Sequence, residues 1–338
     1  MAIVAAIAVF CLMILSHEFG HFSMAKLAGI YVYDFSLGMG PKLLSFKRKE
    51  TQYSLRLFPI GGHCQMMGED EISDDPRSFN KKKVWQRMLV IAGGPAMNFI
   101  TAMLLFIIIF MMMGTPSGGN MVGNVITGQA AEAAGILPGD IIVEINGQAV
   151  NTWLDISPAV ASREAGQTVD VVVQRDSGQV ALSMQPYFEA ESGRWLIGIM
   201  PAIEKQNLFT AIKLGVKQSV LFTKALILAL VGMIAGSVPP DVTGPVGVVT
   251  IIGEASSYGL QSLLMIAAIL SVNLAVVNLL PIPALDGARL IFLAVEGVRR
   301  KPFNREREGM VHLAGFMLLI VLMIVLTFKD VARLISGG

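Results

Sequence analysis

The chain has 338 residues, of which 54% are hydrophobic and only 15% are charged. Soluble globular proteins carry about 25% charged residues, so this composition excludes an ordinary soluble enzyme and indicates a membrane protein. The net charge of +1 and the absence of a basic tail give no reason to expect a nucleic-acid partner, and two cysteines are too few for a disulfide framework.

Several apolar runs reach the roughly 20 residues that a membrane-spanning helix needs. The first run lacks the basic start and cleavage site of a signal peptide, so we expect it to be retained. We predict an α-helical polytopic membrane protein with about four transmembrane helices. In chain order it has a first span at 1–28, a cytoplasmic loop at 29–87, a second span at 88–113, a soluble domain at 115–203, amphipathic membrane-associated helices at 207–260, a third span at 263–298 and a fourth at 309–330.

Basic residues orient these segments. Lysines and arginines are concentrated at 42–87 and again at 299–307, and the positive-inside rule places both stretches in the cytoplasm. The region 115–205 is poor in basic residues and falls outside by alternation. An odd number of crossings must then lead to Arg299, so we expect the apolar run Ala225–Val238 to lie on the membrane without crossing it.

The outer domain has the pattern of a small β-rich module. Its β-branched runs at 122–126, 141–145, 169–174 and 180–184 are separated by turn signals. The segment A-G-I-L-P-G-D-I-I, followed by E-I-N-G, resembles a PDZ domain. The resemblance implies a groove that accepts a peptide or a substrate terminus as an added strand, and a simple spacer is the alternative.

The first span contains His17-Glu18-Phe19-Gly20-His21, an H-E-x-x-H motif. Residues i and i+4 share one face of a helix, so both imidazoles can reach one zinc ion, and Glu18 is placed to act as general base on a bound water. Ionisable side chains inside a membrane cost about 2.5–3.5 kcal/mol each, which makes a packing role for all three hard to sustain.

A catalytic zinc needs a third protein ligand. Asp286 is the candidate, because it follows Pro281 and Pro283 in N-L-L-P-I-P-A-L-D-G and the prolines break the third span. Irregular backbone at membrane depth is tolerated where it faces protein or a water-filled cavity. Both spans run inward, so Asp286 and His17 fall at a similar depth in the cytoplasmic half. The alternative for Asp286 is a helix cap.

Together these segments resemble the site-2 protease family of intramembrane zinc metalloproteases, peptidase family M50, in its bacterial regulator of sigma-E protease branch. The resemblance covers nearly the whole chain. It implies that His17, His21 and Asp286 are zinc ligands and that Glu18 is the catalytic glutamate. It also implies cleavage of single-span membrane proteins, such as anti-sigma factors or remnant signal peptides, after another protease has trimmed them. The expected location is the bacterial cytoplasmic membrane.

The resemblance also suggests residues that bind substrate. Asn278 matches an asparagine that contacts substrate backbone. Asn98 lies in the second-span signature A-G-G-P-A-M-N-F, with a helix–helix hydrogen bond as its alternative role, and Asn273 is equally open to a structural role. Gly61 and Gly62 lie in 52–67, where we expect a cytoplasmic, membrane-associated β-hairpin whose edge pairs with an unwound substrate.

Some features leave room for other interpretations. His63 is unattractive as a fourth ligand because it would fill the position of the water, and His312 is interpreted as an interfacial residue. Well-known members of the family carry two PDZ domains, whereas this chain has room for one. A metal transporter and an inactive PDZ-displaying scaffold are the alternative functions. The position of Glu18 favours hydrolysis over transport, and a scaffold would leave the three buried ionisable groups and Asp286 unexplained.

Overall fold

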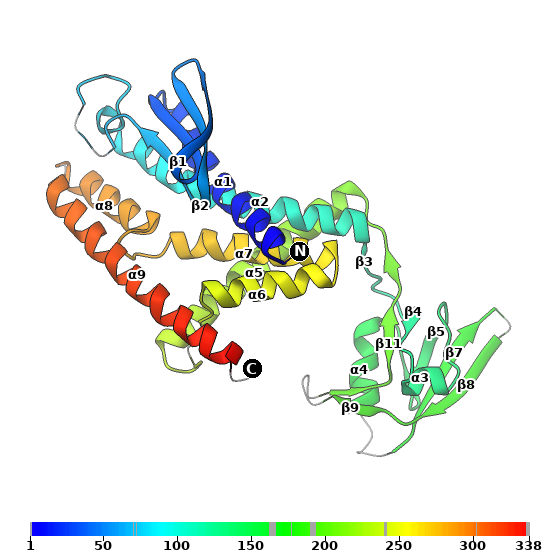
Figure 1. Cartoon of the computed structure of the whole chain (residues 1–338). Coiled ribbons are helices and arrows are strands. Elements are labelled where there is room, and N and C mark those ends of the chain that lie inside the picture. The colour runs from blue at the N-terminus through cyan, green and yellow to red at the C-terminus, as the bar shows by residue number, and fades with distance from the viewer. Residues whose placement is uncertain are drawn as a thin grey trace. The chain divides into compact units, whose positions relative to one another are not determined.

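The computed structural model describes residues 2–69, 71, 73–161, 167–176, 178–189, 194–239, 242–301 and 303–335. They divide into two compact units (Figure 1). The membrane unit comprises Met1–Ile109 and Phe209–Gly338, and the β-rich unit comprises Phe110–Leu208.

Helices dominate the membrane unit. They are α1 (Ala2–Leu27), α2 (Val84–Met113), α5 (Leu208–Ile234), α6 (Pro245–Ser257), α7 (Leu260–Asn278), α8 (Asp286–Arg299) and α9 (Arg305–Ile335), with a short 3-10 helix at Phe79–Lys81. In the described part of the chain, five of these helices are long and apolar enough to cross a membrane, namely α1, α2, α5, α7 and α9. The chain is therefore a helical protein with several candidate membrane spans.

Two of the predicted segments differ in detail from the helices observed. The region 207–260 contains α5, which runs unbroken for 27 residues and qualifies by length and composition as a span, although we predicted that it lies on the membrane. The predicted third span divides into α7 and α8, and the break falls at the two prolines. Length and composition alone do not settle the number of crossings, so the count of four stays a prediction.

Close contact between α1 and α2 depends on glycine. An added Cβ at Gly20 would lie 2.0 Å from the carbonyl oxygen of Gly93, and one at Gly93 would lie 2.7 Å from the carbonyl oxygen of Gly20. Small residues allow helix backbones to approach each other closely in membranes. The pair thus brings the H-E-x-x-H face of α1 directly against α2.

The helix α6 begins against α9. The carboxylate of Asp330 accepts hydrogen bonds from the backbone N–H groups of Gly244 and Gly247, at 3.2 and 2.7 Å. The first N–H groups of a helix have no partner within the helix, so a buried carboxylate at this place both satisfies them and complements the helix dipole. This contact explains the Gly244-Pro245-Val246-Gly247 segment as a docking point between two helices.

The segment between α1 and α2 forms a two-stranded antiparallel sheet of β1 (Val32–Arg48) and β2 (Thr51–Met66). Asp34 pairs with both Gln52 and Gln65, so the first half of β1 lies between the two halves of β2. We predicted a hairpin inside 52–67, but the pairs observed are all between β2 and β1. The sheet exposes several large apolar side chains, which are Met39, Leu43, Leu44, Phe46, Leu55, Leu57 and Phe58.

The β-rich unit has its own core. Its strands are β3 (Thr115–Pro116), β4 (Val122–Val125), β5 (Ile141–Ile145), β6 (Gln148–Ala149), β7 (Val169–Arg175), β8 (Gly178–Met184), β9 (Tyr187–Glu189), β10 (Arg194–Leu196), β11 (Ile199–Pro201) and β12 (Ile203–Glu204), with helices α3 (Ala130–Ala133) and α4 (Trp153–Ala161). The largest sheet has the order β6-β5-β7-β8. Alternate residues of β7, Val169, Val171 and Val173, are fully buried, as a strand with one buried face requires. The four predicted strands are all present.

Candidate metal centre

Three side chains that lie far apart in the sequence meet in the membrane unit. The Nε2 atoms of His17 and His21 are 3.1 Å apart. One carboxylate oxygen of Asp286, Oδ2, lies 3.2 Å from the Nε2 of His17 and 3.4 Å from the Nε2 of His21. We call these three residues the ligand cluster. All their candidate ligand atoms lie within 4.8 Å of one another.

The ligand cluster fits a zinc ion. Its Asp286 Oδ2 atom is buried and accepts no hydrogen bond from the described residues. Two imidazole nitrogens and a carboxylate oxygen that converge without protons between them repel one another, and a cation relieves this repulsion. Two histidines and one carboxylate form a donor set found in catalytic zinc sites, which leave a fourth position open.

Neighbouring groups orient both imidazoles. The Nδ1 atom of His21 lies 2.9 Å from the carbonyl oxygen of Val90, which can only accept, so Nδ1 carries the proton and Nε2 keeps its lone pair for the cluster. The Nδ1 atom of His17 faces the side-chain amides of Asn98 at 3.2 Å and Asn278 at 3.5 Å. An amide can present either its donor or its acceptor, so both can fix the ring of His17.

The three predicted asparagines have different environments. Asn98 is fully buried, and Ser271 of α7 donates a hydrogen bond to its backbone carbonyl at 2.8 Å. Asn278 ends α7 beside His17. Asn273 is exposed. Because it lies five residues before Asn278, it points away from that face of the helix.

The chain break before α8 places Asp286. The helix α7 ends at Asn278, and Asp286 is the first residue of α8. At Gly287 an added Cβ would lie 2.2 and 2.3 Å from the carbonyl oxygens of Leu280 and Leu279, so only glycine permits this tight turn. Asp286 is therefore the first residue of a helix, and the Oδ2 atom of its side chain points to the two histidines.

A pocket of about 530 Å³ opens beside the cluster. Gly62 of β2 lies against Glu18, since an added Cβ would be 2.5 Å from the Glu18 Cγ atom. Gly61 has a positive φ of 79° and packs on Met39. The pocket is lined by His17, Glu18, His21, Gly62, His63, Cys64, Met66, Glu69, Ile91, Ala284, Asp286, Arg289, His312, Leu313 and Phe316. His63 thus lies near the site without belonging to the ligand cluster.

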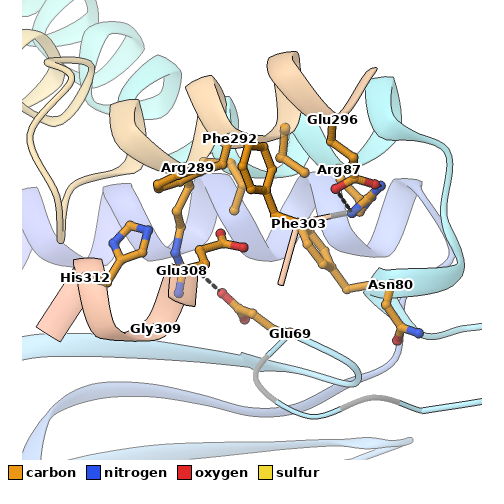
Figure 2. Close-up of a pocket in the computed structure, with 13 residues that line it drawn as sticks. Glu69, Asn80, Arg87, Arg289, Phe292, Glu296, Phe303, Glu308, Gly309 and His312 are labelled. Atoms are coloured by element: carbon orange, nitrogen blue, oxygen red, sulfur yellow. Dashed lines mark hydrogen bonds and ion pairs between the residues drawn. The ribbon is translucent and has the colours of Figure 1, made fainter. Parts of the chain in front are cut away.

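A second pocket, of about 480 Å³, shares Glu69, Ile91, Arg289 and His312 with the first (Figure 2). An ion pair of 2.5 Å between Arg289 and Glu69 lies at this shared wall, and Arg87 pairs with Glu296 further along. Apart from His312, sequence reasoning missed the residues of the shared wall, because Arg289 and Glu69 lie far apart in the sequence.

Sequence reasoning also missed Gly94. An added Cβ there would lie 2.4 Å from the Nε2 of His21 and 2.7 Å from the Cε1 of His17. The two imidazoles therefore fit over α2 only because this position lacks a side chain. The residue lies within the second-span signature, where the pair of adjacent glycines was the feature that could have indicated a close contact at this position.

Comparison with known proteins gives a consistent result across the chain. The model of peptidase family M50 matches residues 5–322. A predicted zinc metalloprotease of Clostridium acetobutylicum is 40% identical, with 97% of each chain covered. The Bacillus subtilis protein named regulator of sigma-W protease RasP is 32% identical over 416 aligned positions, with 98% of each chain covered. A zinc metalloprotease RasP of Geobacillus kaustophilus is 31% identical, again with 98% of each covered.

Solved structures match a smaller part of the chain. The PDZ domain of an SdrC-like protein from Listeria monocytogenes is 21% identical and covers 26% of this chain and 90% of its own, with a TM-score of 0.22. Its Listeria innocua counterpart is 27% identical and covers 26% and 99%, with a TM-score of 0.23. These scores are too low to carry an argument, so a PDZ groove remains a prediction.

Proposed function

Because the chain belongs to peptidase family M50 and is a membrane zinc metalloprotease, we propose that the ligand cluster holds its zinc ion and that Glu18 is its general base. The convergence of His17, His21 and Asp286 on one point is the observation that carries this proposal. Two of these residues lie four apart on one helix, and the third lies more than 260 residues later. Burying ionisable side chains inside a membrane protein costs free energy, which argues against a chance meeting of this donor set.

The chemistry divides between the metal and the chain. A catalytic zinc, when bound, lowers the pKa of a water molecule and polarises a peptide carbonyl. Glu18 lines the same pocket as the ligand cluster. We infer that its carboxylate takes the proton from the attacking water and passes it to the leaving amine. The carbonyl of Val90 fixes the tautomer of His21, so that its Nε2 atom stays unprotonated toward the pocket, and the amide of Asn98 orients the ring of His17.

The substrate is a membrane protein, and we propose that it binds as an extended strand. The second half of β2 pairs with β1 and also lines the pocket through Gly62, Cys64 and Met66. A helical transmembrane segment hides its peptide bonds, whereas an added strand presents its carbonyls in a row. Gly61, Gly62 and Asn278 would contact the substrate backbone. A substrate-binding role has less support for Asn273, because its side chain is exposed and points away from the face of α7 that carries Asn278.

The physiological substrates follow from the relatives only by analogy. One relative is named regulator of sigma-W protease. We propose single-span membrane proteins already trimmed by another protease, such as anti-sigma factors or remnant signal peptides. The β-rich unit would lie outside the cytoplasmic membrane and bind a peptide or a substrate terminus in a PDZ-type groove, and the catalytic pocket would lie in the cytoplasmic half.

The test uses the full chain purified in detergent. We expect Glu18→Gln to keep close to one zinc per chain and to lose cleavage of a reconstituted single-span substrate by more than about a hundredfold, because general-base catalysis supplies about 10²–10⁴-fold. Asp286→Ala should lose both zinc and cleavage. Glu254→Gln, on the exposed face of α6, is the matched control and should behave as wild type.

Zinc content by elemental analysis and cleavage by gel mobility give the outcomes. Substantial cleavage by Glu18→Gln would contradict its role as base. Full zinc occupancy in Asp286→Ala would remove Asp286 from the ligand set. A wild-type chain that never binds zinc would instead support the scaffold interpretation.

A further inference from the structure

We propose that His312 of α9 is a positioning residue for Asp286, acting through the turn that precedes α8. The inference rests on the proposed function in one respect, since it takes Asp286 to be a zinc ligand. It assigns to α9 a role in metal binding, although this helix supplies no member of the ligand cluster.

A hydrogen bond joins the two segments. The backbone N–H of Ala284 donates to the Nδ1 atom of His312 at 2.9 Å. Ala284 has a φ of 78°, a left-handed conformation that residues with a Cβ rarely adopt and that the surroundings must maintain. The bond to His312 is therefore a contact that holds an unfavourable turn in place two residues before Asp286.

A second contact fixes the same turn. An added Cβ at Gly315 would lie 2.4 Å from the Cβ of Pro283 and 2.6 Å from its carbonyl oxygen. Residues 312 and 315 are three apart on a helix and share one face. One face of α9 thus contacts Pro283 and Ala284 together, by packing and by a hydrogen bond. These contacts fix the chain two and three residues before Asp286.

The imidazole of His312 is itself held in one state. Because Nδ1 accepts the N–H of Ala284, it carries no proton, and the neutral ring has its proton on Nε2. The ring also packs against Phe292 of α8, with centroids 5.8 Å apart, and Figure 2 shows the two side chains on the same pocket. His312 thereby bridges the start of α9, the turn and the body of α8.

This arrangement matters because metal affinity is sensitive to ligand position. Groups that orient a ligand without touching the metal typically contribute 10–100-fold to metal affinity. Loss of the acceptor at position 312 would let the turn relax toward an ordinary backbone conformation and shift the carboxylate of Asp286. We therefore expect a loss of zinc affinity with the ligand set intact.

The experiment measures zinc affinity by chelator competition on the full chain in detergent, without reference to proteolysis. We expect His312→Ala to bind zinc about 10–100-fold more weakly than wild type. His312→Asn should stay within about threefold of wild type, because its side-chain oxygen is attached to Cγ as Nδ1 is and can accept the same N–H. Val311→Ala, at the exposed neighbouring position, should be unchanged.

Each outcome separates the two proposals. Wild-type affinity in His312→Ala, with zinc lost in Asp286→Ala, would overturn this inference and leave the proposed function standing. Equal losses in the Ala and Asn variants would also overturn it, because the acceptor would then be irrelevant. Retained zinc in Asp286→Ala would instead remove Asp286 from the ligand set, which contradicts the proposed metal site and the premise of this inference together. If His312→Ala does not fold, His312→Leu removes the acceptor while filling the space, and the same comparison with His312→Asn decides the matter.

Discussion

At the scale of single residues, the candidate site depends on positions where a side chain is missing as much as on the ligands. Gly94 leaves room for both imidazoles over α2, and Gly62 leaves room for Glu18 under β2. Interiors are close-packed, so an additional methyl group at either place must displace a functional side chain or a backbone segment. These glycines are thus part of the site, although neither carries a reactive group.

We predict that Gly94→Ala loses zinc while the chain stays folded. Alanine favours a helix by about 1 kcal/mol over glycine, so the helix itself should gain stability. The new Cβ would nevertheless overlap the Nε2 of His21 and the Cε1 of His17. The measurement is zinc per chain alongside helix content by circular dichroism. Gly309→Ala, a helical glycine with open space around it, is the control, and full zinc binding by Gly94→Ala would refute the prediction.

At the scale of elements, two charged contacts hold helices and strands in register. Asp330 joins α9 to the beginning of α6, and Asp140 joins the start of β5 to Arg175 at the end of β7. Neither contact is local in the sequence. Each carboxylate is almost fully buried, so each contact contributes more to the stability of the fold than an exposed surface ion pair does.

Removing the Asp330 carboxylate should destabilise the membrane unit. We expect Asp330→Ala to lower the stability by about 1–3 kcal/mol, because it leaves the N–H groups of Gly244 and Gly247 without their acceptor. Asp330→Asn should be milder, as it keeps one acceptor oxygen. The apparent Tm in detergent at a fixed heating rate measures the effect. Val325→Ala, at an exposed position of α9, is the control, and an unchanged Tm in Asp330→Ala would speak against the docking contact.

The Asp140 contact predicts a pH dependence of the β-rich unit. The guanidinium of Arg175, at 2.6 and 2.8 Å, together with the N–H of Leu137, holds the pKa of the Asp140 carboxyl below its ordinary value of 3.8. A lowered folded pKa contributes stability that is fully present above the unfolded pKa and is lost as the pH falls through the folded pKa. We expect the stability difference between wild type and Asp140→Asn to be largest near pH 7 and to shrink below about pH 4.

Hydrogen exchange of the core strands β5 and β7 in the full chain measures this difference as the pH is lowered. A gap between the two proteins that stays constant down to acid pH would show that the ionised carboxylate is not the stabilising group. Glu144→Gln, at an exposed carboxyl in the same unit, provides the comparison for a side chain outside the core.

At the scale of the whole molecule, the open question is whether α5 crosses the membrane. Five helices qualify by length and composition, whereas the distribution of basic residues favours four crossings. If α5 crossed as well as α7, the basic residues at 299–301 would lie outside. Charge and hydropathy thus give different counts, and only the position of the two ends of α5 can decide between them.

We predict that both ends of α5 lie outside the cytoplasm. Single cysteines at Gln206 and Ser237, in a chain whose Cys11 and Cys64 are replaced, should both react with an impermeant thiol reagent in intact cells. A cysteine at Lys301 should react only after permeabilisation, and this serves as the internal control. Protection of the Ser237 position in intact cells would instead establish α5 as a fifth span.

The sequence by itself determined the class of this protein and the candidates for its chemistry. Helical periodicity alone puts His17 and His21 on one face, the cost of burying charge marks Glu18, and the two prolines mark Asp286. The strands of the β-rich unit followed from β-branched runs separated by turn signals. The structure brings together the three predicted ligands, and their binding of zinc stays a prediction.

Only the tertiary structure decided which atoms meet. The pairing of both halves of β2 with β1, the fit of two imidazoles over Gly94 and the contact of His312 with Ala284 each join segments far apart in the chain. Local patterns specify which face of an element is apolar, but they do not specify its partner at a given turn. That choice depends on close packing and on satisfying buried hydrogen-bonding groups, which are properties of the folded chain as a whole.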